Sequence, residues 1–189
     1  MNRTWSSRVP DAIDALVTRL RAVTQNTDLT IRDGPWVEGG TDPQVIVIGF
    51  NGFRADYLRP TGATSEDFGT AAVSVSGASD GLGAGIRETF TISCASIVRT
   101  GDTKAIAVAR RQSYNNVKVV GAVLVEPPLW LGGTVMRAVL GTSHSLDYVH
   151  DRRGLLVFLP FMIECEAQAQ QLCHGKKCLR HARTRAALP

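Results

Sequence analysis

Aromatic residues make up only 6% of this 189-residue chain, although 44% of its residues are hydrophobic. The apolar content is sufficient for the core of one domain, whereas so few aromatic rings argue against a cage around a ligand. The longest apolar runs, Val45–Phe50 and Leu155–Ile163, are far shorter than the roughly 20 residues that span a bilayer. Residues 1–8 are polar and do not resemble a signal peptide. We therefore expect a soluble protein that is neither membrane-bound nor secreted.

Catalytic and metal-binding signatures are missing as well. The chain contains no G-x-S-x-G elbow, H-E-x-x-H helix, Walker loop or C-x-x-C pair. Zinc sites usually place two ligand pairs well apart, which disfavours the tightly spaced set Cys173, His174, Cys178 and His181. The glycine-rich segment 80–85 precedes a predicted strand rather than a helix, which favours a flexible connection over a dinucleotide site. We therefore predict a protein without catalytic residues, metal or cofactor.

One pair of carboxylates leaves an alternative open. Glu164 and Glu166 are two residues apart in a predicted strand, so they share one face of it. Two neighbouring carboxylates can support acid–base chemistry. A solvated strand end, or a surface that meets a basic partner, explains the same pair without catalysis, and we favour this second interpretation.

The charge of the chain is distributed unevenly. The formal net charge is +4, but all 17 acidic residues lie at or before Glu166. The part before Ala167 has a formal charge of −1, whereas the rest carries five basic residues and no acidic one: Lys176, Lys177, Arg180, Arg183 and Arg185. We predict a domain over residues 1–167 and a basic extension over 168–189. By charge, this extension is the only part that could bind nucleic acid. It can equally be a disordered end or an arm that docks on an acidic neighbour, and we rank these two interpretations ahead of DNA contact.

Two segments show the spacing of amphipathic helices. In residues 10–24, Pro10 suits the first turn and apolar residues recur three to four positions apart. Residues 103–121 form the second predicted helix, with an apolar stripe of Ile106, Ala109, Ser113, Tyr114, Val117 and Val120.

Strands are predicted in the remaining apolar segments. Those before the second helix are Leu29–Arg32, Gln44–Phe50, Thr70–Ser79 and Ile86–Thr100. A long hairpin follows, with arms at Thr134–Val149 and Gly154–Glu166, and Pro160 favours a bulge or an edge position in the second arm. This order predicts an α+β fold in which two helices pack on a mostly antiparallel sheet of five or six strands.

The order of elements resembles that of tail terminator proteins from long-tailed bacteriophages, especially those that infect actinobacteria. The likeness covers roughly residues 8–167. It is carried by VPDAIDALVTRLRAV, LTIRDGPWVEGGTDPQVIVIGF, GLGAGIRETFTISCASIVRTGDTKAIAVARRQSYNNV and GLLVFLPFMIECEA. The basic extension is not part of this pattern, and segment 51–68 is longer than the pattern implies.

The resemblance implies a structural function in the virion. The chain would form a ring of six copies at the head-proximal end of the tail tube, stop growth of the tube protein and join the tail to the head connector. Its partners would be copies of itself, the major tail tube protein and a connector or head-completion protein. Contacts to these partners are expected from loops and hairpin tips, at Phe53, Arg54, Tyr57, Leu58, Arg152 and Arg153.

Two other functions remain open. Another neck component, such as a connector or head-completion protein, would also form a ring from a small α+β domain. A nucleic-acid-binding module would act through the basic extension, which lacks aromatic residues for base stacking and so favours backbone contact.

Overall fold

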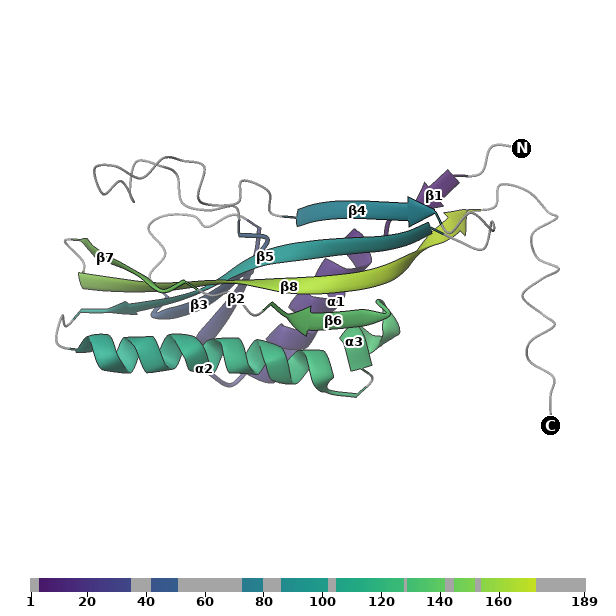
Figure 1. The fold of residues 1–189 in the computed structure, drawn as a ribbon. Helices are drawn as coiled ribbons and strands as arrows, with labels where there is room; N and C mark the ends of the chain where they lie inside the picture. Colours follow the sequence, from purple (N-terminus) through teal and green to yellow (C-terminus); the bar gives the residue numbers. More distant parts are fainter. Residues whose placement is uncertain are drawn as a thin grey trace, which may run out of the picture.

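The computed structural model describes residues 4–34, 42–50, 73–79, 86–101, 105–127, 129–141, 145–151 and 154–172. The elements are β1 (Thr4–Ser6), α1 (Val9–Thr24), β2 (Leu29–Asp33), β3 (Gln44–Ile48), β4 (Val73–Ser79), β5 (Ile86–Thr100), α2 (Ile106–Val125), α3 (Leu129–Gly133), β6 (Arg137–Leu140), β7 (Asp147–Asp151) and β8 (Gly154–Leu172). The described strands form one sheet, and the described helices lie on one side of it (Figure 1). The predicted α+β class is confirmed.

The long strands β5 and β8 are the centre of the sheet. They pair antiparallel over 15 positions, from Ile86 opposite Ala169 to Thr100 opposite Leu155. On the edge of β5 that faces away from β8, β3 and β4 pair with different parts of the strand. On the edge of β8 that faces away from β5, β6 and β7 do the same. Only the pairing of β2 with β3 is parallel among the described strands. At its widest the sheet is five strands across, in line with the predicted five or six strands, and the short strands at its edges bring the described total to eight.

The predicted alternation of β5 determines which side of the sheet is covered. Phe90, Ile92 and Cys94 are fully buried on the helix side, whereas Arg87 and Thr89 are exposed on the other side. The same core contains Leu16 and Leu20 of α1 and Ile46 and Ile48 of β3, among others. Each such side chain contributes about 2 kcal/mol by leaving water. Burial of this shared core therefore fixes both helices on one face.

Helix α2 agrees with the prediction on four of its stripe residues and differs on two. Ala109, Ser113, Val117 and Val120 are buried, but Ile106 and Tyr114 are about 40% exposed. Asn116 is buried in their place: its Nδ2 donates to Ser96 Oγ at 3.3 Å, and Ser113 Oγ donates to the same oxygen at 3.2 Å. A buried polar group is tolerated when it is hydrogen-bonded. The orientation of α2 thus depends on hydrogen bonds to Ser96 of β5, which the helical periodicity of the sequence does not indicate.

The predicted arm Thr134–Val149 is not one strand but two. β6 and β7 pair with separate parts of β8, on either side of Pro160. The carbonyls of Met162 and Glu166 accept hydrogen bonds from Gly141 and Met136, so backbone groups of even-numbered residues here point to the outer edge. Pro160 has the same parity and no N–H to offer there, which explains the break. Pro160 therefore lies between the parts of β8 that pair with β6 and β7, although β8 itself is a central strand.

The structure adds two elements that the sequence pattern did not predict. β8 continues to Leu172, five residues into the predicted extension, and its end pairs with β1. α3 is a left-handed turn in which Trp130, Leu131 and the two following glycines all have positive φ. For Trp130 and Leu131 this conformation costs about 1–2 kcal/mol each, which the burial of Leu131 offsets.

The N-terminus of α1 is capped from the sheet. The carboxylate of Glu88 on β5 accepts a hydrogen bond from the backbone N–H of Arg8 at 2.8 Å, and Glu88 is only 8% exposed. We expect Glu88→Gln to lower the free energy of unfolding by about 1.5 kcal/mol, because the charge-assisted bond at the positive end of the helix dipole is weakened. Urea denaturation followed by circular dichroism measures this change. Glu164→Gln, at an exposed carboxylate of β8, is the matched control, and an equal effect of both variants would contradict the capping role.

Candidate functional site

One end of the sheet is a segment of four strands, β4-β5-β8-β6. On its side away from the helices, Thr89 of β5, Glu164 of β8 and Arg137 of β6 are exposed. The register places Ser76, Thr89, Glu166 and Arg137 in one row across the four strands. The neighbouring row consists of Ser74, Thr91, Glu164 and Val139. We call the side that carries these two rows, together with Arg87 and Met162, the open face. Its charges are mixed, which gives it no strong preference for an ion of either sign.

Glu164 and Glu166 both lie on the open face, as their spacing predicted. Glu166 forms an ion pair with Arg87 and lies directly opposite Arg137 in the register. Glu164 is exposed. An exposed carboxylate beside a salt-bridged one does not form a preorganised acid–base site. The geometry favours the interpretation of these residues as a solvated or partner-facing surface.

The two edges of the four-strand segment are its second feature. Among the described strands, none pairs with the outer edge of β4 or with that of β6. An unpaired edge presents a row of backbone donors and acceptors that another strand can use. The segment therefore offers hydrogen-bonding surfaces on both sides, at the same level of the sheet.

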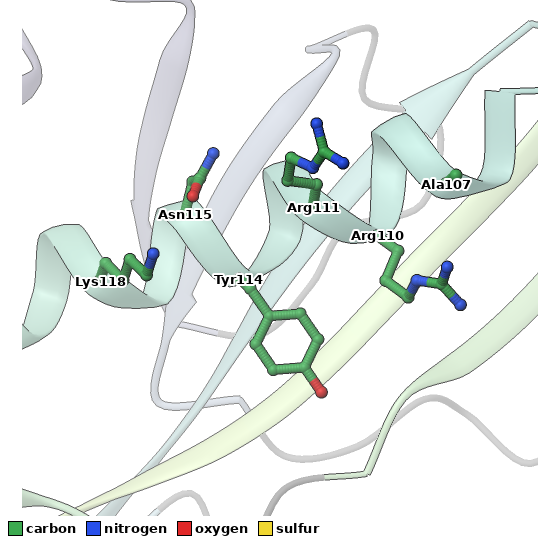
Figure 2. A pocket seen from close by; sticks show the side chains of 6 residues that line it. All are labelled: Ala107, Arg110, Arg111, Tyr114, Asn115 and Lys118. Carbon is green, nitrogen blue, oxygen red and sulfur yellow. The ribbon is translucent and has the colours of Figure 1, made fainter.

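A third feature is a positively charged surface on the outward side of α2. Arg110, Arg111, Tyr114, Asn115 and Lys118 line a shallow, open depression of about 320 Å³ together with Ala107. Figure 2 shows Arg110 and Tyr114 leaving the helix on one side and Arg111 and Asn115 on the other. We call these five polar residues the cationic surface. α2 contains no acidic residue, and the three cations make no ion pair with any described residue.

Neither a family model nor a curated protein matches the chain. Chemistry inside the core is disfavoured on physical grounds: burial raises the pKa of Cys165 to about 12 and raises that of Cys94 as well, so neither thiol is a nucleophile at neutral pH. In the described part of the chain, no three His, Cys, Asp or Glu side chains are grouped to hold a metal ion. No helix in those ranges is long and apolar enough to cross a membrane.

The residues that the sequence predicted for partner contact lie outside the described residues. This holds for Phe53, Arg54, Tyr57 and Leu58, for Arg152 and Arg153, and for the basic residues Lys176, Lys177, Arg180, Arg183 and Arg185. The hairpin that carries Arg152 and Arg153 is confirmed by its flanking pair, because Asp151 lies opposite Gly154. The pairing of β7 with β8 includes His150 and Asp151, which the sequence had placed in the turn at His150–Arg153.

The sequence interpretation missed the cationic surface because it averaged charge over the whole domain. The part before Ala167 has a formal charge of −1, which conceals a run from residue 103 to 125 that contains no acidic residue. The test that singled out the C-terminal extension, a search for segments without acidic residues, would also have found this run. The edge positions of β4 and β6 had no comparable signal, because edges depend on the order of strands in space.

Proposed function

We propose that this chain is a structural subunit of a long-tailed bacteriophage. Copies of it close into a ring that caps the head-proximal end of the tail tube, ends growth of the tube and joins it to the head connector. The proposal places the protein in the virion, after assembly in the bacterial cytoplasm, and requires neither catalysis nor a cofactor. The observation that carries it is the pair of open edges on the four-strand segment, and the sequence resemblance supplies the biological setting.

The β4 edge lacks the features by which proteins prevent strand addition. Its sequence, V-S-V-S-G-A-S, contains no charged residue and no proline over seven positions. Monomeric proteins commonly protect such edges with lysine, proline or a bulge. An unprotected edge of this length favours pairing with a strand from another molecule.

The β6 edge is suited to receive it. β4 and β6 lie at the same level, since Ser76 and Arg137 belong to one row. Three successive antiparallel pairings, β4–β5, β5–β8 and β8–β6, make β4 and β6 run in opposite directions. A rotation axis parallel to the strands preserves these directions, so β4 of one copy meets β6 of the next in antiparallel orientation. Such a head-to-tail contact closes into a ring when the rotation allows it.

The size of such a ring suits a channel. Six copies of a four-strand segment would give 24 strands, and a strand spacing of about 4.8 Å yields a wall about 115 Å around. The corresponding diameter, roughly 37 Å between opposite backbones, leaves space for a nucleic-acid duplex. Strand tilt would widen the ring further.

Another neck component is the first alternative, because a connector or head-completion protein would use the same ring contacts. Position in the particle separates the two: a terminator binds the end of the tail tube, whereas a connector binds the head side. The second alternative, a nucleic-acid-binding module, requires no ring.

The direct test is the mass and shape of the protein, alone and mixed with the tube protein. We expect light scattering and negative-stain imaging to show rings that cap tube ends and limit tube length. A protein that stays monomeric in the presence of tubes, and leaves tube length unchanged, would refute the proposal. Rings that ignore tubes but bind the head connector would favour the first alternative.

The β4 edge can be tested separately with charged substitutions. We expect Ser74→Lys combined with Ser76→Lys to abolish ring formation, because two like charges on the edge repel an incoming strand. Both positions lie on an edge strand, opposite Thr91 and Thr89 in the register, and we expect the free energy of unfolding to change by less than about 0.5 kcal/mol. Thr18→Lys with Gln25→Lys, at exposed positions of α1 and its C-cap, adds the same charge away from any edge. Rings that persist in the β4 variant would show that closure uses another surface.

A further inference from the structure

We infer that the cationic surface of α2 binds the phosphodiester backbone of nucleic acid without regard to sequence. The inference is independent of the ring, because the cationic surface lies on the helix layer, whereas the proposed ring contacts are the sheet edges β4 and β6 (Figure 1). It also differs from contact through the basic extension, because Arg110, Arg111 and Lys118 belong to the folded domain.

The three cations of the surface are available to bind an anion. Arg110, Arg111 and Lys118 are exposed, and no described carboxylate neutralises them. Elsewhere several arginines of the domain are paired: Arg8 with Asp11, Arg32 with Asp42 and Arg87 with Glu166. Three cations on one helix face without a described carboxylate partner make a surface suited to an anion.

All polar side chains of the cationic surface can donate hydrogen bonds. Arginine and lysine only donate, and the Tyr114 hydroxyl and the Asn115 amide add further donors. Phosphate oxygens only accept, so every polar side chain of the surface can serve a nucleic-acid backbone. No side chain of this surface is restricted to accepting, as a carboxylate would be.

The arrangement of charged and apolar residues on α2 favours nucleic acid over an acidic protein as the partner. Protein interfaces usually have an apolar centre, depleted of charge, and a polar rim. On α2 the cations Arg110, Arg111 and Lys118 flank the amphipathic Tyr114, and the more exposed apolar residues Val108 and Val125 lie outside this stretch. This arrangement favours a partner held by charge rather than by an apolar anchor.

The spacing of the cations agrees with this partner. Arg110 and Lys118 are eight residues apart, which is about 12 Å along the helix axis. A stretch of duplex of that length carries about seven phosphate charges. The exposed ring of Tyr114 between the two cations can pack against a sugar while its hydroxyl donates to phosphate.

The test is fluorescence anisotropy of a labelled 20-base-pair DNA duplex with the full-length protein at 50–200 mM salt. Three phosphate contacts predict a contribution of about −2.7 to the slope of log affinity against log salt concentration. That contribution corresponds to about 40-fold weaker binding at the higher salt. We expect the triple variant Arg110→Gln, Arg111→Gln, Lys118→Gln to bind at least tenfold more weakly at 50 mM salt and to lose this part of the slope.

Two further variants make the result decisive. Lys176→Gln, Lys177→Gln, Arg180→Gln removes the same charge from the basic extension, and we expect it to keep the contribution of α2 to the slope. Arg110→Lys with Arg111→Lys keeps the charge and should retain binding within about threefold. The inference is overturned if the wild-type protein does not bind the duplex at 50 mM salt, or if the α2 variant loses less than tenfold. It is also overturned if poly-glutamate of equal charge competes as well as unlabelled duplex, which would identify an acidic protein as the partner.

Discussion

Gly154→Ala is expected to lower the free energy of unfolding by about 3 kcal/mol or more. Gly154 begins β8 with φ of +120°, a conformation that L side chains rarely adopt. A Cβ atom at this position would also overlap the carbonyl oxygen of Thr100 and lie 2.9 Å from Cα of Gly101. The strained backbone costs about 1–3 kcal/mol, and the overlap adds about as much because backbone atoms cannot move aside without disturbing the β5–β8 pairing. Chemical denaturation followed by circular dichroism gives the change directly.

The control for this variant isolates the conformational cost from the overlap. Gly34 also has a positive φ, of +97°, but a Cβ atom there would meet nothing within 4 Å. Gly34→Ala should therefore cost only about 1 kcal/mol. If both variants lose the same stability, the overlap with the backbone of Thr100 and Gly101 contributes nothing to the loss in Gly154→Ala, and the expected difference is wrong. A loss of less than about 1 kcal/mol in Gly154→Ala would contradict the hairpin geometry itself.

The sequence predicted the parts of the fold that depend on local periodicity. Over residues 87–93 the alternation correctly separated the buried face of β5 from its open face, because here one side of the strand packs on helices and the other meets water. Further along, Ala95 and Ile97 are buried as well, so both faces of the strand are covered there. The continuous apolar run in β3 correctly indicated burial on both faces, since Val45–Ile48 are all within 1% of complete burial. The class of the fold followed from the order of such segments.

What the sequence did not predict depends on partners that are distant in the chain. Tyr114 fits the apolar stripe of α2 better than Asn116 does, yet Asn116 is buried because Ser96 of β5 accepts its hydrogen bond. The break between β6 and β7 follows from the missing N–H of Pro160 on the neighbouring strand. Neither cause is visible within the segment that it affects.

The candidate surfaces divide in the same way. The shared face of Glu164 and Glu166 was predictable from a spacing of two, whereas the ion pair of Glu166 with Arg87 depends on the register of β8 against β5. The cationic surface was present in the sequence as a run without acidic residues. The open edges of β4 and β6 emerge only from the strand order, so the observation that best supports a ring required the structure.

The two proposals use different layers of the molecule and can fail separately. Charges on β4 should prevent ring closure and leave binding of a DNA duplex by α2 intact, because the edge and the outward face of α2 are on separate layers. Neutral residues on α2 should weaken duplex binding and leave the ring intact. A variant that weakens the common core should instead reduce both, in proportion to the fraction of unfolded protein.

Phe161→Ala is such a core variant, and we expect it to lower the free energy of unfolding by about 3–5 kcal/mol. Phe161 lies opposite Cys94 in the β5–β8 pairing, is 2% exposed and belongs to the core shared by both long helices. Removing its ring forfeits the burial of a large side chain and leaves a cavity between the helices and the centre of the sheet. The surrounding residues belong to a regular sheet and two helices, so they cannot collapse far into that space.

The adjacent residue in the same strand provides the control. Met162 points to the open face and is 45% exposed, so Met162→Ala should change the free energy of unfolding by about 0.5 kcal/mol or less. Both variants are compared by urea denaturation at one protein concentration, because ring formation would make stability depend on concentration. Equal losses of unfolding free energy in the two variants would contradict the register, which buries Phe161 and exposes Met162 on opposite faces of β8. We expect Phe161→Ala to reduce ring formation only in proportion to the unfolded fraction of the subunit. The β4 variant should instead abolish ring formation while the subunit stays folded. This pair of results would show that the edge, and not the core, makes the contact between copies.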